Sequence, residues 1–223
     1  MIPLRDTLPS HSTPYVTAII IALNVMIFGF EMTLTSFELN EFIHVFGLVP
    51  ADFNTLSLFT SMFLHGGIMH LVGNMWFLWI YGDNVEDILG HGKYLLFYLL
   101  CGVAAAVLQY VTGPESRIPM VGASGAIAGV MGAYMVKFPH SRILVLIPIF
   151  ILFTTVEVPA LLILLYWFVL QFFSGLGSIA RTEATQGGVA FWAHIGGFLA
   201  GIVLIYVMRT RERYRRRYSD VSW

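Results

Sequence analysis

The chain has 223 residues, of which 57% are hydrophobic and 11% are charged, and its net charge is −1. Soluble globular chains carry about 25% charged residues, so this composition predicts a protein whose apolar surface faces lipid. The aliphatic and aromatic content excludes a disordered chain. The single Cys101 excludes a disulfide scaffold, and the near-neutral charge argues against a nucleic-acid partner.

Six apolar stretches approach the roughly 17–25 residues that a helix needs to cross a bilayer. They cover residues 15–32, 67–82, 93–111, 122–138, 158–175 and 191–208. The sequence therefore predicts an all-α integral membrane protein built as a bundle of six transmembrane helices. This membrane domain, residues 15–208, is expected to lie between a short N-terminus at 1–14 and a basic tail at 209–223.

A seventh apolar stretch, residues 143–156, is shorter than the others and contains Pro148. We expect it to be interfacial, re-entrant or an extension of the next helix, because a seventh span would move the Arg-rich tail across the membrane. With six spans, all Lys and Arg residues except Arg117 and Arg181 fall on the side that holds both termini. Positive charge favours the cytoplasmic side, so both termini are expected in the cytoplasm.

The connection after the first span, residues 33–66, is long and rich in apolar side chains. A water-exposed loop would not need them. We therefore expect this loop to dip into the outer leaflet or to pack on the bundle, and long loops of this kind are often functional.

Polar residues inside spans are costly and are functional candidates by default. Ser124 opens the fourth span between small neighbours, in the run Gly122-Ala123-Ser124-Gly125. The free N–H groups at a helix start can stabilise a developing anion there. Gly125 and Gly129 are four apart and favour close helix packing. An isolated Ser in this setting is more often a packing residue.

Two further polar clusters lie at the starts of other spans. His194 opens the sixth span and is followed by Gly197 and Gly201, which repeat the small pair. His70 and Asn74 are four apart in the second span, so they share one helix face. Taken alone, His194 is better explained as a solvated interfacial His. Taken alone, His70 and Asn74 are uninformative, because a structural interhelical hydrogen bond would explain them.

Depth connects the three clusters. Spans two, four and six all enter from the outer side if the N-terminus is inside, and His70, Ser124 and His194 each lie near the start of their span. A nucleophile, a base and hydrogen-bond donors at one depth are what acyl transfer requires. Seven spans would place His194 on the opposite side from Ser124.

Three segments, in this order and spacing, resemble the rhomboid intramembrane serine proteases: HGGIMHLVGNMWFLWIYGDNVED at 65–87, GASGAIAG at 122–129 and AHIGGFLAG at 193–201. The resemblance covers nearly the whole chain. It implies the six-helix rhomboid fold, a catalytic dyad of Ser124 and His194, and an oxyanion site formed by His70, Asn74 and the Ser124 N–H. The implied substrates are transmembrane segments of other membrane proteins, cleaved near the outer face of the bilayer.

The sequence departs from many members of that family in two places. Ala128 stands where many carry an aromatic residue that packs on the catalytic His, so a neighbour from the second or sixth span is expected to orient His194. Residues 33–66 contain no Trp and no Arg, where many carry a Trp-Arg pair. The fifth span lacks a small-residue face, and we expect it to form a lateral gate with the loop 176–190.

Two other kinds of protein remain as alternatives. The first is a catalytically inactive rhomboid-like protein that binds transmembrane helices as an adaptor. The second is a small transporter or channel, which the apolar cytoplasmic halves of the spans disfavour. No HExxH motif is present, and we expect neither a metal nor a cofactor. The compact six-span form favours a bacterial or archaeal plasma membrane, whereas the substrate and the oligomeric state are not determined.

Overall fold

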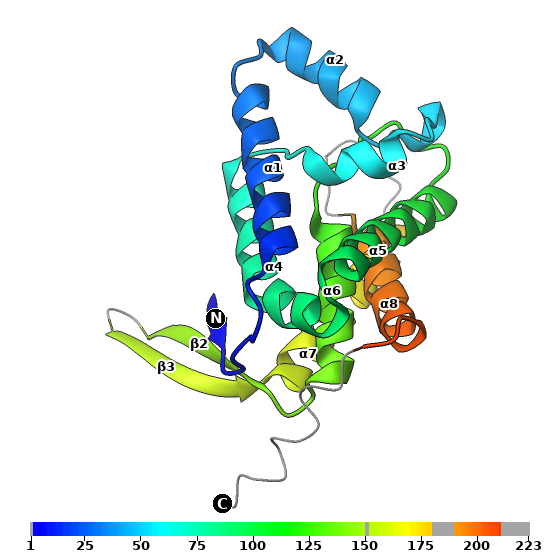
Figure 1. Cartoon of the computed structure of the whole chain (residues 1–223). Helices are drawn as coiled ribbons and strands as arrows, with labels where there is room; N and C mark the ends of the chain where they lie inside the picture. Colours follow the sequence, from blue (N-terminus) through cyan, green and yellow to red (C-terminus); the bar gives the residue numbers. More distant parts are fainter. Residues whose placement is uncertain (1, 150–151, 180–189, 211–223) are drawn as a thin grey trace, which may run out of the picture.

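Helices make up most of the computed structural model, which describes residues 2–149, 152–179 and 190–210 (Figure 1). Helix α6 (Ser124–Lys137) lies inside the bundle. It packs against α4 (Ile68–Leu89), α5 (His91–Thr112), α7 (Ala160–Ile179) and α8 (Phe191–Val207). Helix α1 (Tyr15–Glu31) packs on α4. These six helices follow the six predicted apolar stretches in order, and the predominantly helical membrane fold is confirmed.

Helix length alone does not determine the number of membrane crossings. Within the described residues, His91–Thr112 and Ala160–Gly177 are long and apolar enough to cross a membrane, and Tyr15–Glu31 and Phe191–Val207 are apolar but shorter. Helix α6 has 14 residues, which at about 1.5 Å per residue is shorter than a hydrocarbon core of about 30 Å. The count of six spans therefore stays a prediction.

The seventh apolar stretch forms a β-hairpin. Strands β2 (Arg142–Ile149) and β3 (Leu152–Pro159) pair antiparallel, and β1 (Ile2–Asp6) completes a sheet of order β1-β2-β3. The expected extension of the next helix is therefore wrong, and this small sheet is an addition to a fold that is otherwise helical. Strands form here because the stretch is rich in β-branched residues, which favour strands. Pro148 also interrupts it, and proline disrupts the interior of a helix.

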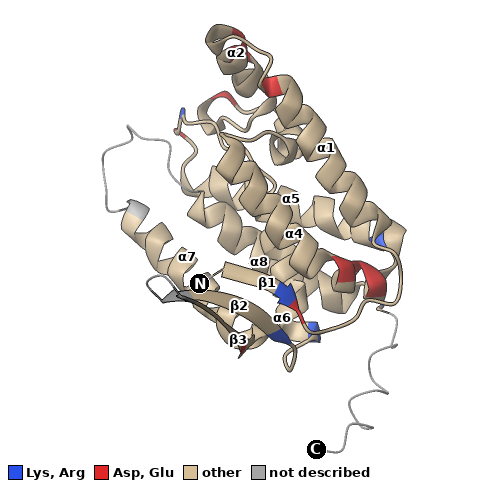
Figure 2. Ribbon diagram, turned by 90° about the vertical axis from the view of Figure 1, so that its left-hand side faces the viewer, with Lys and Arg blue, Asp and Glu red and all other residues tan. Residues whose placement is uncertain are grey.

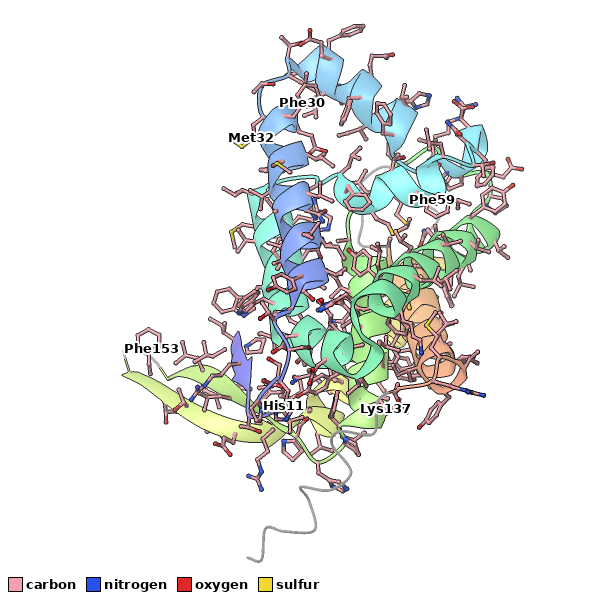
Figure 3. The ribbon with its side chains drawn as sticks, in the orientation of Figure 1. His11, Phe30, Met32, Phe59, Lys137 and Phe153 are labelled. Atoms are coloured by element: carbon pink, nitrogen blue, oxygen red, sulfur yellow. The ribbon has the colours of Figure 1, made fainter. Side chains whose placement is uncertain are left out.

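The hairpin lies at the end of the bundle where α6 ends and α7 begins (Figure 1). Ile143 and Val145 are buried against the helices. Phe153, on the outermost strand, is 70% exposed and projects away from the bundle (Figure 3). The chain thus leaves and re-enters the bundle at the same end, so this stretch adds no membrane crossing.

The first long loop packs on the opposite end of the bundle, which is one of the two placements expected for it. It contains α2 (Ser36–Phe46), α3 (Ser57–Thr60) and the short 3-10 turns η1 (Pro50–Asp52) and η2 (Ser61–Phe63). Leu48 and Met120 exchange two backbone hydrogen bonds of 3.0 and 2.8 Å. The buried Met62 contacts α5 over Gly102. Backbone pairing and apolar packing therefore anchor a loop that has no Trp-Arg pair.

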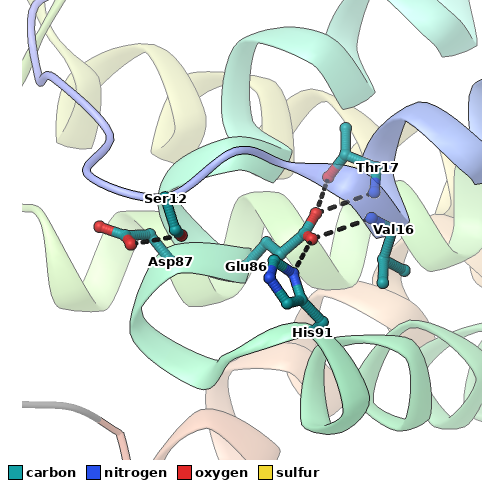
Figure 4. Close-up of polar contacts among 6 residues, drawn as sticks. All are labelled: Ser12, Val16, Thr17, Glu86, Asp87 and His91. Carbon is teal, nitrogen blue, oxygen red and sulfur yellow. Dashed lines mark hydrogen bonds and ion pairs between the residues drawn. The ribbon is translucent and has the colours of Figure 1, made fainter.

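A buried carboxylate ties α1 to α4. Glu86, on α4, has no exposed surface. Its oxygens accept hydrogen bonds from Val16 N (2.9 Å), Thr17 N (2.8 Å), Thr17 Oγ1 (2.7 Å) and His91 Nδ1 (2.6 Å) (Figure 4). The first N–H groups of a helix have no partner within it, and a negative charge is favourable there. Glu86 thus caps α1 from a neighbouring helix.

Further acidic side chains gather at the same end of α4, where the red segments cluster in Figure 2. Asp87 accepts a hydrogen bond of 2.6 Å from Ser12 Oγ. Asp6, on β1, accepts one of 2.6 Å from the Tyr134 hydroxyl of α6. Burial raises the pKa of Asp6 to about 7, although the bond from Tyr134 opposes the shift. These contacts fasten the N-terminal segment beneath the bundle.

Candidate active site

Ser124 and His194 meet at one end of the bundle. Ser124 is the first residue of α6, and His194 lies in the first turn of α8. Because both helices start at the same end, the Ser124 Oγ lies 2.9 Å from the His194 Nε2 although 70 residues separate them in the chain. His194 is 8% exposed. This is hydrogen-bond contact between a hydroxyl and a basic nitrogen, in a largely buried setting.

Four of the glycines singled out in the sequence hold α6 and α8 together. Gly125 and Gly129 of α6 face Gly197 and Gly201 of α8. A β-carbon on Gly197 would collide with the Gly125 carbonyl oxygen, and one on Gly201 with the Gly129 carbonyl oxygen. Only glycine permits this backbone approach. The close crossing brings the two helix starts, and with them Ser124 and His194, within bonding distance.

The imidazole of His194 is held by α7, not by the second or sixth span as expected. The Gln171 Oε1 lies 2.8 Å from the His194 Nδ1. The Trp167 ring lies on the imidazole with centroids 5.5 Å apart and planes tilted by 40°. Trp167 and Gln171 are four apart and share one face of α7, a spacing that the sequence displays without revealing what the face contacts.

His70 and Asn74 approach the serine from α4. A β-carbon on Gly122 would lie 2.7 Å from the His70 ring and 3.4 Å from the Asn74 Nδ2. Gly122 also has a φ of +120°, which L side chains rarely adopt. Both side chains therefore reach the backbone two residues before Ser124, at a place where only glycine fits.

His65 completes this group, although no sequence motif assigns it a role. Its Nε2 lies 2.9 Å from the Asn74 Nδ2, and its ring meets the His70 ring edge-on with centroids 5.1 Å apart. The five-residue spacing of His65 and His70 gives no helical face, because His65 precedes α4. Its contact with Asn74 thus depends on the path of the loop.

A cavity of about 230 Å³ opens beside the pair. Residues from α4, α6, α7 and α8 line it: Met69, His70, Gly73, Asn74, Phe77, Ser124, Ile127, Met131, Trp167 and His194. A second, largely apolar cavity of about 520 Å³ between α4, α7 and the sheet shares Phe77, Met131 and Trp167 with the first. The two cavities therefore adjoin, and together they run from Ser124 toward the β-sheet.

The described residues offer no set of ligands for a metal ion. Within residues 2–149, 152–179 and 190–210, no group of three His, Cys, Asp or Glu side chains could hold a metal ion. The absence of a metal or cofactor from the working protein stays a prediction.

The fold and the site define a predominantly helical membrane protein that holds a Ser and a His in contact at one end of its bundle. The family model of the Rhomboid domain matches residues 52–211. The match extends over more than half of the chain and contains every residue of the site. This chain belongs to the rhomboid family.

Individual relatives agree. Over 210 residues the chain is 26% identical to Rhomboid protein 1, mitochondrial, of Saccharomyces cerevisiae, covering 89% of this chain and 55% of the yeast protein. It is 35% identical over 130 residues to Rhomboid protease GluP of Bacillus subtilis, covering 56% of this chain and 25% of GluP. It is 34% identical over 97 residues to Presenilin-associated rhomboid-like protein A, mitochondrial, of Danio rerio. The chain thus spans about half or less of the length of these relatives.

Proposed function

We propose that this chain is an intramembrane serine endopeptidase that cleaves transmembrane segments of other membrane proteins near the outer face of the bilayer. The observation that carries the proposal is the 2.9 Å contact between Ser124 Oγ and His194 Nε2 beside a cavity open to a substrate. Membership of the rhomboid family, in which GluP is named a protease, supports it.

The chemistry follows from the contacts. Ser124 Oγ attacks the scissile carbonyl while His194 Nε2 takes the hydroxyl proton, and the imidazolium then gives that proton to the leaving amine. A water molecule attacks the resulting ester by the same route and regenerates the Ser124 hydroxyl. With no carboxylate among the residues that line the cavity, the pair works as a dyad.

The developing oxyanion needs donors, and three lie in reach of the serine backbone. His70 and Asn74 lie against Gly122, and the N–H of Ser124 belongs to the first turn of α6, where N–H groups have no partner within the helix. Removing one such donor typically lowers kcat by about 10²–10³-fold.

The substrate path is proposed from the two adjoining cavities. The larger one is almost wholly apolar and lies between α4 and α7. An apolar segment entering from the lipid between these helices would reach Ser124 without crossing water. Helix α7 exposes many apolar side chains, among them Phe172 and Phe173, which fits the gate expected there. Most of the loop 176–190 expected to join the gate lies outside the described residues.

The remaining proposals concern topology. We propose a membrane domain over 15–208 with both termini in the cytoplasm, which puts Ser124 in the outer half of the membrane. The basic tail at 209–223 lies almost entirely outside the described residues. The similar proteins include mitochondrial ones as well as the B. subtilis protease, so they give no support for the bacterial or archaeal plasma membrane expected from the sequence.

The test is cleavage of a reporter transmembrane substrate by purified protein in liposomes. We expect wild type to cut near the outer end of the substrate helix, and Ser124→Ala and His194→Ala to be inactive. Ser141→Ala and His44→Ala are the matched controls, because they remove the same groups far from the pair and should stay active. Cleavage by Ser124→Ala at the wild-type rate would refute the dyad. A wild-type protein that retains the substrate uncut would instead indicate a helix-binding adaptor.

A further inference from the structure

We propose that Gln171 is the positioning residue that selects the tautomer of His194. Its side-chain oxygen accepts the Nδ1–H of the imidazole and so leaves Nε2 unprotonated, as the proton acceptor for Ser124. The inference rests on the proposed protease function. It means that a residue of α7 prepares His194 to act as the general base.

The two ring nitrogens of His194 face different partners. His194 Nδ1 lies 2.8 Å from Gln171 Oε1, and His194 Nε2 lies 2.9 Å from Ser124 Oγ. A neutral imidazole carries one proton, so one nitrogen donates and the other accepts. With an oxygen acceptor facing Nδ1, the proton belongs on Nδ1. The lone pair of Nε2 then points at the serine hydroxyl, which is the arrangement that a general base requires.

The opposite tautomer is disfavoured at Gln171, and it is unproductive at Ser124, whose hydroxyl would accept the Nε2–H instead of donating. It would place the Nδ1 lone pair against the Gln171 oxygen, where two acceptors repel. It would also point Nε2–H at Ser124, so that the hydroxyl could not pass its proton to the ring. The Gln171 side chain thus favours the tautomer in which His194 can accept the Ser124 proton.

The group that faces His194 Nδ1 and can select its tautomer is a neutral amide, that of Gln171. The described residues that line the cavity include one other titratable side chain near the ring, His70 from α4, and no carboxylate. In a Ser-His-Asp triad an acid fixes the tautomer and orientation of the ring. Gln171 is partly buried and can supply the same acceptor without bringing a charge into the membrane.

Trp167 orients the plane of the His194 ring. It lies one helical turn before Gln171 and leans on the imidazole at a centroid distance of 5.5 Å. Trp167 therefore sets the plane of the ring, and Gln171 sets its rotation within that plane and the place of its proton. Together they replace the aromatic neighbour that Ala128 does not provide.

The kinetic test compares Gln171→Met, which keeps the length of the side chain but removes the acceptor, with Gln171→Glu, which keeps an acceptor oxygen. Val107→Met is the matched control, since Val107 is 45% exposed on α5, outside the proposed gate. During proton transfer the Nδ1–H becomes part of a cation, and its hydrogen bond strengthens. We therefore expect Gln171→Met to lower kcat by about 10- to 100-fold, with KM within about twofold, and Gln171→Glu to recover most of kcat.

The spectroscopic test reads the tautomer itself. In protein labelled with 15N-histidine at pH 8, the His194 signals are identified by their loss in His194→Ala. We expect wild type to show a protonated Nδ1 and an unprotonated Nε2, and Gln171→Met to shift His194 toward the other tautomer at an unchanged melting temperature.

Two results would overturn the assignment of Gln171. One is a protonated Nε2 in the neutral wild-type protein. The other is a Gln171→Met variant with wild-type kcat while Ser124→Ala is inactive, which would leave the protease function standing. A wild type that cuts no substrate would count against the function instead, and the NMR signals would still decide the tautomer.

Discussion

Replacing Glu86 by Ala should destabilise the protein more than any change to an exposed acid. The carboxylate is fully buried and accepts four hydrogen bonds, three from the start of α1 and one from His91 (Figure 4). The substitution leaves Val16 N, Thr17 N and Thr17 Oγ1 facing a cavity. It also removes the negative charge that lies at the N-terminus of α1.

The magnitude follows from those donors. Leaving a buried donor unsatisfied costs about 1–3 kcal/mol, and breaking a buried charged interaction typically costs about 3–5 kcal/mol. Water that enters the cavity will satisfy part of the loss, so we expect the free energy of unfolding of Glu86→Ala to fall by about 3–5 kcal/mol. That corresponds to a melting temperature lower by roughly 10 °C for a chain of this length.

The assay is thermal and denaturant unfolding of the purified protein in one detergent. Glu38→Ala is the matched control, because the exposed Glu38 also accepts a backbone hydrogen bond at a helix start, from Thr35 N at 2.8 Å. We expect its effect to be several-fold smaller. Equal losses of unfolding free energy in the two variants would contradict this expectation, since burial would then contribute nothing to the effect of Glu86.

Two further predictions concern packing and pH. Gly201→Ala places a methyl group on the Gly129 carbonyl, so unfolding in detergent should show a loss of about 1–3 kcal/mol from overpacking. Gly29→Ala, where a β-carbon meets nothing within 4 Å, should instead be neutral or stabilising, and equal losses would contradict the close-packing argument. Burial raises the pKa of Asp6 to about 7, so the folded protein binds more protons than the unfolded chain between about pH 4 and pH 7. Stability should therefore fall as pH rises through this range, and Asp6→Asn should flatten the melting temperature between pH 5 and pH 8, whereas an unchanged slope would exclude Asp6 as its source.

The seventh apolar stretch shows where the sequence was insufficient. Residues 143–156 are apolar except for Thr154 and Thr155. A short apolar run can be a strand or a buried helix segment, and periodicity does not distinguish the two. Local composition favours strands over a helix, and the pairing of β2 with β1, about 140 residues earlier in the chain, adds the third strand of the sheet. A contact that distant leaves no mark in the local pattern.

The contacts of single side chains show the same limit. No sequence motif assigns a role to Gln171 or His65, although both contact residues of the site. Glu86 lies past the predicted end of the second span, and α4 continues to Leu89. In each case the partner depends on how a helix is rotated about its axis or on the path of a loop. Hydropathy defines neither.

Hydropathy and spacing are enough to locate the six apolar helices and to predict which end of the bundle carries the site. A long apolar segment in lipid must satisfy its backbone internally, so it becomes a helix. If these helices are successive spans, they alternate in direction, and the starts of α4, α6 and α8 are predicted on one side with His70, Ser124 and His194. The neighbours that hold the imidazole become visible in the folded bundle alone. The contact of α7 with His194 depends on side-chain packing between helices, and packing is a property of the assembled bundle.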